Sequence, residues 1–334
     1  MRVWEIQDNG LPRDGESGRD VYETSSERQA LWSAVFAPKG DRILTIGGTG
    51  ARLWDRDSGL PLNVFTPHGH VASASFSPDG KLIVTGGWDN TARIWNTSQR
   101  KTERKLIGHT GFVNSAQFSP DGTQTLTASD DRTARLWDVR SGKVVTTFRG
   151  HSDRVRTAIF SPDGTRILTA SNDKTAVMWN AANGQQQFKL IGHEWPVLAV
   201  AISRNGKIIA TGSEDHTTRL WNAKTGKPIQ FRMAQGNLPG RLAGHTDSVT
   251  AVSVSPDGRR LVTGSADRSA KIWELRSGRE ILTLREHQGP LTSVEFSPDG
   301  RSILTSSRDE TAIIWFTQPW DEQVAVRSEK NMDF

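Results

Sequence analysis

Tryptophan recurs along this chain at an almost constant interval, and this regularity constrains the possible folds more than any other feature. Successive members of the series lie 41, 42, 42, 42, 52 and 42 residues apart. Such a period predicts a repeat array, in which each copy is one small structural unit and neighbouring copies share a core. The chain therefore holds seven units, with ten extra residues before the sixth. The series is Trp54, Trp95, Trp137, Trp179, Trp221, Trp273 and Trp315.

Each unit predicts four short strands. In the third unit, residues 119–122 (SPDG) form a turn, because proline presets φ at its second position and glycine suits the fourth. An alternating segment, VNSAQF, precedes this turn. The segments TQTLTA, TARLW and KVVTTF follow it, with polar turns between them. Four antiparallel strands per repeat are typical of a propeller blade.

Three motifs carry a resemblance to a known family: Gly-His pairs before four of the units, SPDG turns, and a closing Trp-Asp or Trp-Asn. The Gly-His pairs lie at 108–109, 150–151, 192–193 and 244–245. The closing dipeptides lie at 54–55, 95–96, 137–138, 179–180 and 221–222. The chain resembles the WD-repeat β-propeller family, of the bacterial type, over about residues 19–316. The resemblance implies an all-β, seven-bladed propeller of four-stranded antiparallel blades, with the ring closed by an N-terminal outer strand.

Two segments compete for that closing position. In the family, the strand before the first full unit completes the last blade, and residues 19–25 are our choice. Residues 322–328 are the alternative. We assign residues 1–18, which include Trp4, to a partial repeat remnant and linker, 19–316 to the propeller, and 317–334 to a C-terminal tail. Whether the chain is a fragment of a longer array or multidomain protein stays open.

Composition excludes several classes of site. The chain has no cysteine, so it has no disulfide, thiolate metal site or cysteine nucleophile, and a reducing compartment, the cytoplasm, suits it. Its net charge of +5 arises from 42 basic and 37 acidic residues without a concentrated basic run. This mixture predicts a solvated surface rather than a nucleic-acid partner. No segment approaches the length of a membrane span. We expect a monomeric ring without metal or cofactor.

A histidine, a threonine and an aspartate precede the tryptophan at fixed offsets in five units. One such set would suggest catalysis, but five copies indicate a repeated structural network, since an enzyme needs one constellation beside a pocket. The resemblance implies that aspartate binds histidine, histidine binds threonine, and threonine binds the indole N–H. The sets are His109/Thr127/Asp131/Trp137, His151/Thr169/Asp173/Trp179, His193/Thr211/Asp215/Trp221, His245/Thr263/Asp267/Trp273 and His287/Thr305/Asp309/Trp315.

The first two units depart from this pattern. The histidine position corresponds to Glu27 in the first unit and to Pro67 in the second. His70 follows a glycine but lies three residues too late, so it is a false match, and His68 is one residue off. We expect these two blades to be the least stable part of the ring.

The resemblance also places two loops of each blade on one rim, the top face. Tryptophans outside the repeat slot gather there, on loops of consecutive blades beside arginines, and exposed aromatics with arginine are typical of interface hot spots. The alternative is that these rings plug the channel mouth. Arg154 and Arg156 could receive a carboxylate or phosphate. The candidate partner-binding residues are Trp32, His70, Trp88, Phe112, Asn114, Asp130, Arg154, Arg156, Trp195 and Arg308.

Three functions follow from these features. The first is a non-catalytic scaffold that binds a protein or peptide partner of unknown identity on the top face. The second is the sensor propeller of a signalling system associated with a kinase or a nucleotide-switch ATPase. The third is an enzyme or small-ligand binder that uses the central channel, which would need a titratable cluster outside the repeat positions. We expect the first, because a propeller fold alone does not select a function and no such cluster is evident.

Overall fold

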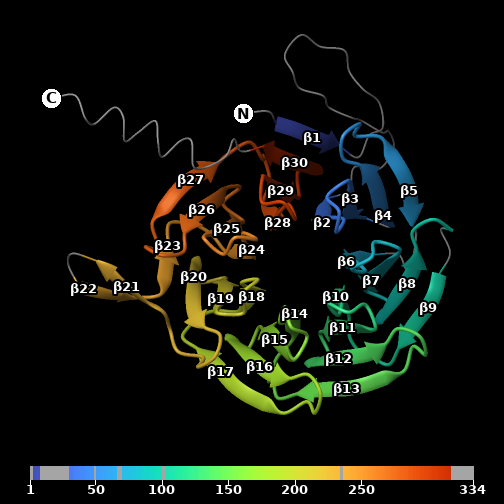
Figure 1. Cartoon of the computed structure of the whole chain (residues 1–334), viewed down its shortest axis with the longest axis horizontal. Helices are drawn as coiled ribbons and strands as arrows, with labels where there is room; N and C mark the ends of the chain where they lie inside the picture. Colours follow the sequence, from blue (N-terminus) through green and yellow to red (C-terminus); the bar gives the residue numbers. More distant parts are fainter. Residues whose placement is uncertain are drawn as a thin grey trace, which may run out of the picture.

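The chain forms a ring of seven four-stranded antiparallel sheets (Figure 1). The computed structural model describes residues 3–7, 30–48, 50–65, 70–99, 102–233 and 236–316. The predicted all-β, seven-bladed propeller is confirmed.

The blades follow one another in chain order. Blade 1 contains β2 (Leu31–Phe36), β3 (Arg42–Gly47), β4 (Gly50–Asp55) and β5 (Pro61–Phe65); blade 2 contains β6 (Val71–Phe76), β7 (Leu82–Gly87), β8 (Thr91–Asn96) and β9 (Thr102–Ile107). Blade 3 contains β10 (Val113–Phe118), β11 (Gln124–Ser129), β12 (Thr133–Asp138) and β13 (Val144–Arg149); blade 4 contains β14 (Val155–Phe160), β15 (Arg166–Ser171), β16 (Thr175–Asn180) and β17 (Gln186–Ile191). Blade 5 contains β18 (Val197–Ile202), β19 (Ile208–Ser213), β20 (Thr217–Asn222) and β23 (Arg241–Ala243); blade 6 contains β24 (Val249–Val254), β25 (Arg260–Ser265), β26 (Ala270–Glu274) and β27 (Glu280–Leu284); blade 7 contains β28 (Leu291–Phe296), β29 (Ser302–Ser307) and β30 (Thr311–Phe316).

Burial changes across each blade from the channel to the outside. The two middle strands are buried along most of their length, because neighbouring blades cover both faces of each sheet. The outer strand is mostly exposed; β13, for example, buries only Phe148 fully. The first strand lines the central channel and alternates between buried and half-buried residues. Short apolar segments therefore suffice to hold the ring together.

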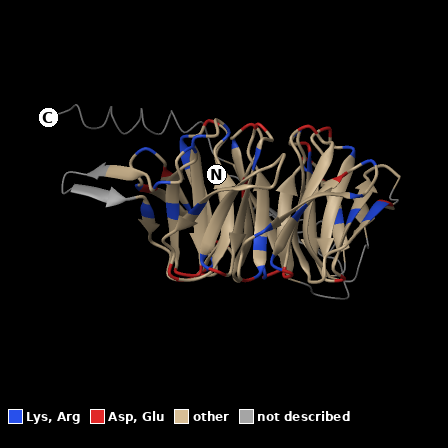
Figure 2. Cartoon of the chain, turned by 90° about the horizontal axis from the view of Figure 1, so that it is seen from below, with Lys and Arg blue, Asp and Glu red and all other residues tan. Residues whose placement is uncertain are grey.

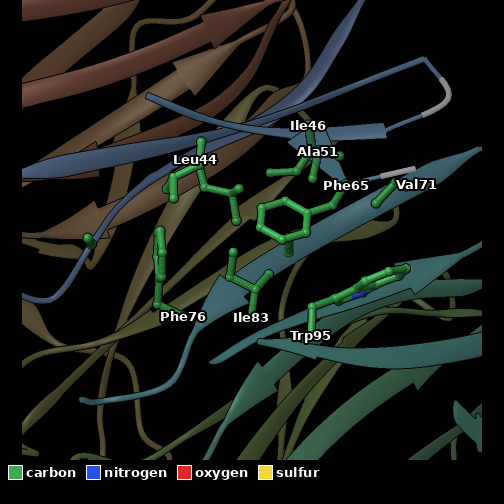
Figure 3. Packing of buried hydrophobic residues seen from close by; sticks show 11 residues of the cluster. Leu44, Ile46, Ala51, Phe65, Val71, Phe76, Ile83 and Trp95 are labelled. Carbon is green, nitrogen blue, oxygen red and sulfur yellow. The ribbon is translucent and has the colours of Figure 1, made fainter. Parts of the chain in front are cut away.

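Packing between blades 1 and 2 illustrates this arrangement. Leu44, Ile46 and Phe65 from blade 1 meet Ile83 and Trp95 from blade 2 in one buried cluster (Figure 3). The rings of Phe65 and Trp95 contact edge to face, with centroids 6.1 Å apart. Burying side chains of this size contributes about 1.5–3 kcal/mol each. Neighbouring blades are thus joined by a continuous hydrophobic interface.

The outer strand of blade 7 is N-terminal, as predicted, but it is β1 (Val3–Gln7) rather than residues 19–25. β1 pairs antiparallel with β30, with Trp4 opposite Ile314. β1 occupies that edge, and the two segments considered from the sequence, 19–25 and 322–328, lie outside the described residues. From Trp4 to Gln7 the segment alternates apolar and polar residues, as suits a strand with one exposed face. Residues 3–7 are therefore part of the ring and not of a remnant outside it.

The insertion before the sixth unit forms a hairpin, not the loop that its glycine and proline content predicts. β21 (Gln230–Met233) pairs antiparallel with β22 (Gly236–Pro239), and the hairpin projects outward from blade 5 (Figure 1). The outer strand leaves the sheet after Ile229, whose N–H donates to the carbonyl of Leu220 at 2.9 Å. It returns at Gly240, whose carbonyl accepts from the N–H of Leu220 at 2.6 Å. The sheet of blade 5 therefore tolerates the insertion because both hydrogen bonds of Leu220 are kept.

Candidate protein-interaction surface

Two loops of each blade meet at the top face, which we define as the rim where the first and third strands begin. One backbone hydrogen bond ties the two loops together in six blades. In blade 2, for example, the N–H of Trp88 donates to the carbonyl of His70 at 3.1 Å, and in blade 3 Asp130 donates to Phe112 at 2.9 Å. The fold therefore brings the predicted pairs of rim positions side by side.

A β-bulge near the start of each first strand supplies a second set of rim positions. The pairing register of β10 and β11 shifts between Val113 and Ser115, so Asn114 is the extra residue. Bulges leave one residue unpaired and redirect its side chain, and they are common beside binding sites. The bulged residues are Trp32, Ala72, Asn114, Arg156, Leu198, Thr250 and Thr292.

Four aromatic side chains form a continuous group across blades 1 to 3, which we call the aromatic arc: Trp32, His70, Trp88 and Phe112. The rings of Trp88 and Phe112 stack with centroids 5.4 Å apart and planes 13° apart. Trp32 contacts Trp88 edge-on at 5.9 Å, and His70 lies 4.7 Å from Trp88. Trp88 is 37% exposed and Phe112 is 43% exposed. Large aromatic rings thus remain open to solvent although they contact one another.

Charged groups lie at both ends of the aromatic arc. At the blade 7 end, the guanidinium of Arg308 lies 5.4 Å from the ring centroid of Trp32, within cation–π range. At the blade 4 end, Asn114 Nδ2 donates to Asp130 Oδ1 at 2.7 Å, and Arg154 Nη1 lies 3.6 Å from Asp130 Oδ2. Arg154 is therefore directed towards a carboxylate of the same chain.

Two predicted residues stand apart from the aromatic arc. Trp195 lies on blade 5 and is 59% exposed. Arg156, at the bulge of β14, is half-buried. Arg154 and Arg156 therefore differ in their surroundings.

The histidine, threonine, aspartate and tryptophan sets come together inside five blades. In blade 3, His109 Nδ1 lies 2.7 Å from Asp131 Oδ2, and His109 Nε2 lies 2.7 Å from Thr127 Oγ1. The indole N–H of Trp137 donates to Thr127 Oγ1 at 2.8 Å. Equivalent contacts, between 2.7 and 3.0 Å, recur in blades 4 to 7. Each polar atom of the network has a partner, as buried polar groups require.

The threonine lies at the centre of each network and is completely buried. In blade 4, the hydroxyl of Thr169 lies 2.7 Å from His151 Nε2 and accepts from the indole N–H of Trp179 at 2.8 Å. The corresponding distances from threonine to histidine Nε2 are 2.7 Å for Thr211, 2.8 Å for Thr263 and 2.8 Å for Thr305. All five threonines, Thr127, Thr169, Thr211, Thr263 and Thr305, are 0% exposed. In the folded ring these five threonines are therefore closed off from solvent.

Electrostatics determine the direction of these hydrogen bonds. Burial alone would raise the pKa of Asp131, but hydrogen bonds from His109 and Thr133 outweigh it and hold the pKa well below its usual range. Burial lowers the pKa of His109. An ionised Asp131 therefore accepts from Nδ1–H of a neutral His109, whose Nε2 accepts from the hydroxyl of Thr127. The aspartates of blades 4 to 7 show the same lowered pKa.

A family model described as "WD domain, G-beta repeat" (WD40) matches six stretches that together cover more than half of the chain. They are residues 59–96, 100–138, 142–180, 184–222, 236–274 and 278–315. The chain belongs to the WD40 repeat family. Five of the matched WD40 stretches begin two residues before the outer strand of one blade, and the stretch from 236 begins in β22. All six end at the closing tryptophan of the next blade or one residue after it. One sequence repeat therefore spans two blades, because it supplies the outer strand of one blade and the first three strands of the next.

Matches to individual proteins cover short parts of this chain. The nuclear distribution protein nudF of Aspergillus niger is 32% identical over 96 residues, or 28% of this chain and 22% of that protein. A periodic tryptophan protein 2 homolog of Neurospora crassa is 32% identical over 80 residues (23% and 9%). A ribosome biogenesis protein BOP1 homolog of Drosophila melanogaster is 56% identical over 41 residues (12% and 5%). The chain thus spans less than a quarter of each relative, and these eukaryotic relatives do not support the expected bacterial type.

Blades 1 and 2 keep only part of the WD40 network. The indole N–H groups of Trp54 and Trp95 donate to Thr45 and Thr85 at 2.8 and 3.0 Å. In blade 2, Asp89 is present and pairs with Arg93 at 3.0 Å. Blade 1, which has no equivalent aspartate, lies outside the six matched repeats apart from β5. The histidine positions, Glu27 and Pro67, and the nearby His68, lie outside the described residues. His70 contacts Trp88 at the rim instead.

One charged residue of the channel was missed by the sequence analysis. Glu295 lines a cavity of about 430 Å³ that is otherwise lined by uncharged residues of blades 1 to 4 and by Pro298. Its Oε2 accepts from the N–H of Phe36 at 2.8 Å, across the junction of blades 7 and 1. Burial raises the pKa of Glu295 to about 7. The sequence did carry a signal for Glu295. At the same position of the first strand, the other blades have uncharged residues, Val35 and Ser75 among them.

Charge is mixed over the surface of the ring. Figure 2 shows Asp and Glu at loops of both rims, with Lys and Arg between them along the walls. Within the described ranges, no group of three or more His, Asp or Glu side chains could hold a metal ion. No helix among the described residues is long and apolar enough to cross a membrane.

Proposed function

We propose that this WD40 propeller is a non-catalytic interaction scaffold that binds a protein or peptide partner on the aromatic arc. One observation carries the proposal: Trp88 and Phe112 stack on each other yet remain 37% and 43% exposed. Aromatic rings held in a fixed position contribute large contact area at little entropic cost, which is typical of interface hot spots. If the rings served instead to fill the channel mouth, neighbouring residues would cover them more fully.

The flanking charges support a partner with polar groups at the edge of its contact surface. Arg308 at one end is exposed, and Asp130 and Arg154 at the other end form a partly exposed pair. Such rim charges steer association more than they add affinity. WD40 propellers typically bind protein partners, and the names of the relatives, nuclear distribution and ribosome biogenesis, fit an interaction role.

Affinity capture with the immobilised chain, followed by mass spectrometry, tests the proposal. Trp88→Ala combined with Phe112→Ala should remove the captured partner, because truncating hot-spot aromatics costs about 2–4 kcal/mol of binding free energy. We do not choose Trp32 for truncation, because it also packs against the buried cluster of blades 1 and 2. Circular dichroism of the variant confirms that the ring is intact.

Ile191→Ala is the matched control, since it removes an exposed apolar side chain from the outer strand β17, away from the top-face candidates, and it should leave capture unchanged. If the Trp88→Ala/Phe112→Ala variant still captured the partner and Trp195→Ala did not, the binding site would not be the aromatic arc. A captured kinase or nucleotide-switch ATPase would favour the narrower role of a signalling sensor. We also propose a cytoplasmic location, on the ground that a chain without cysteine suits a reducing compartment.

A further inference from the structure

A second cleft lies on the top face, between blades 5 and 6, away from the aromatic arc. It has a volume of about 430 Å³. Its lining residues are Glu194, Trp195, Glu214, Asp215, His216, Arg241 and Ser248. We call it the blade 5 cleft. Its size falls within the range of pockets that hold small ligands or single side chains of a partner.

The residues of this cleft are specific to blade 5. The position after the network histidine holds Glu194 here but Thr110, Ser152, Thr246 or Gln288 elsewhere. The next position holds Trp195, where the other blades with this histidine have glycine or aspartate. The repeat therefore does not require an acidic and aromatic pair at this place.

The backbone hydrogen bonds of the family fold hold the cleft in a fixed shape. The N–H of Glu194 donates to Asp215 Oδ2 at 3.1 Å. The hydroxyl of Ser213 donates to the carbonyl of Trp195 at 3.1 Å, and the N–H of Glu214 donates to the carbonyl of Pro196 at 3.0 Å. The two loops that carry the side chains are thus tied together before any ligand arrives, which lowers the entropic cost of binding.

The charge of the cleft is predominantly negative. Glu194, Glu214 and Asp215 supply three carboxylates, against the single guanidinium of Arg241. The carboxylate of Asp215 is already engaged by His193 at 2.7 Å. Among the described residues, neither Glu194 nor Glu214 forms an ion pair within 4.0 Å, although both line the cleft together with Arg241. Beside them, Trp195 is 59% exposed.

We propose that the blade 5 cleft is a second docking site, which binds an arginine or lysine side chain from an extended segment of a protein partner. The indole of Trp195 contacts the aliphatic stem and the cation of that side chain, and Glu194 and Glu214 pair with its charge. The carboxylates do not form a metal site, since no group of three ligands is arranged for one in the described part of the chain. This site is independent of the aromatic arc.

Panning a phage-displayed dodecamer library against the immobilised full chain tests the proposal. The bound pool should be enriched in arginine and lysine by about five- to tenfold over the input, as a cation–π contact with ion pairing implies. Trp195→Ala combined with Glu214→Gln should abolish the enrichment. Glu214→Lys should reverse the preference towards acidic peptides.

Trp88→Ala with Phe112→Ala is the matched control, and it should leave the enrichment in basic residues unchanged. Enrichment that survives in the Trp195→Ala/Glu214→Gln variant would overturn the proposal, and so would a bound pool without basic enrichment. If the enrichment depends on Trp88 and Phe112 instead, the docking site at the blade 5 cleft is wrong while the scaffold function stands. Circular dichroism and thermal unfolding confirm that each variant is folded.

Discussion

At the scale of single residues, Asp173 shows how a WD40 blade uses a buried carboxylate. Its Oδ2 accepts from His151 Nδ1 at 2.8 Å and from the N–H of Ser152 at 3.1 Å. Its Oδ1 accepts from the N–H of Thr175 at 3.1 Å and from the hydroxyl of Thr175 at 2.5 Å. One side chain thereby joins the loop before the first strand to the loop between the second and third strands. Asp173 therefore fixes the two top-face loops of blade 4 relative to each other.

Asp173→Ala should therefore lower the free energy of unfolding by about 2–4 kcal/mol, because it leaves a buried histidine and two N–H groups without acceptors. Denaturation in urea measures this difference. Asp153→Ala is the control, since Asp153 is an exposed aspartate of the same blade and its loss should cost less than about 0.5 kcal/mol. An equal effect of the two substitutions would argue against a structural role for the network.

The raised pKa of Glu295 predicts that its contribution to the free energy of unfolding falls as pH rises, whereas the contribution of the network aspartates falls as pH decreases. The folded pKa of Glu295 is raised from 4.5 to about 7 by burial. The folded state therefore holds the proton more tightly than the unfolded state. The stabilisation is complete below the unfolded pKa, near pH 4.5, and is lost as pH rises through about 7.

Glu295→Gln should remove this dependence, because the amide stays neutral and its oxygen can still accept from the N–H of Phe36. The variant should match the wild type near pH 4.5 and exceed it by about 1–2 kcal/mol at pH 8, after allowance for water in the channel. Unfolding in urea at several pH values tests this. Glu103→Gln, on the exposed outer strand β9, should leave the profile unchanged. Parallel profiles for wild type and Glu295→Gln would contradict the raised pKa.

At the scale of elements, the hairpin of β21 and β22 is anchored at its base by Phe231. This side chain is 3% exposed and belongs to a buried cluster with residues of blades 5 and 6. A Cβ added to Gly278, at the turn of blade 6 with φ of +72°, would lie 2.7 Å from the ring of Phe231. The base of the hairpin thus packs against the next blade, although β21 and β22 project outward from the ring.

Phe231→Ala should cost about 3–4 kcal/mol of unfolding free energy, through lost apolar burial and the cavity that it leaves. Phe188 provides a matched control, since it occupies the corresponding contact with Gly226 but is only half-buried. Phe188→Ala should therefore cost less. Chemical denaturation measures both, and a smaller loss for Phe231→Ala than for Phe188→Ala would show that the hairpin base does not stabilise the ring.

The sequence predicted the repeated elements well and the unrepeated ones poorly. The strands β10 to β13 follow directly from the SPDG turn and from alternation, because local patterns determine turns and exposed faces. The hairpin was missed, because glycine and proline indicate a turn but do not exclude short strands beside it. The sequence indicated Trp195 but not the rest of the blade 5 cleft, because Glu194 and Arg241 come together beside Trp195 only in the folded chain.

At the scale of the whole molecule, blade 5 carries several departures from the repeat. Around the lower rim, the proline of one SPDG turn usually lies near the glycine of the next, as Pro78 does near Gly122. Blade 5 has SRNG instead, and among the described residues nothing lies within 4 Å of a Cβ added to Gly206. The same blade carries the outward hairpin and the acidic cleft. Departures from the repeat are therefore concentrated in the blade that carries the proposed second docking site.

Ring closure is a second property of the whole molecule that local sequence did not specify. β1 and β30 are about 300 residues apart in the chain, and pairing between distant strands depends on which edge is left open rather than on local pattern. An engineered disulfide tests this closure well, because the chain contains no cysteine. Glu5 and Ile313 are opposite each other in the observed register.

Glu5→Cys with Ile313→Cys should oxidise to a disulfide, detected by mass spectrometry, because paired residues place their Cβ atoms about 4.5–5.5 Å apart and small shifts suffice to form the bond. The link closes nearly the whole chain, so the oxidised variant should be more stable than the reduced form of the same variant by about 4 kcal/mol or more. Tyr22→Cys or Ala325→Cys, each combined with Ile313→Cys, tests the two segments that the sequence favoured. Efficient oxidation of either control, with none for the 5–313 pair, would show that β1 does not close the ring.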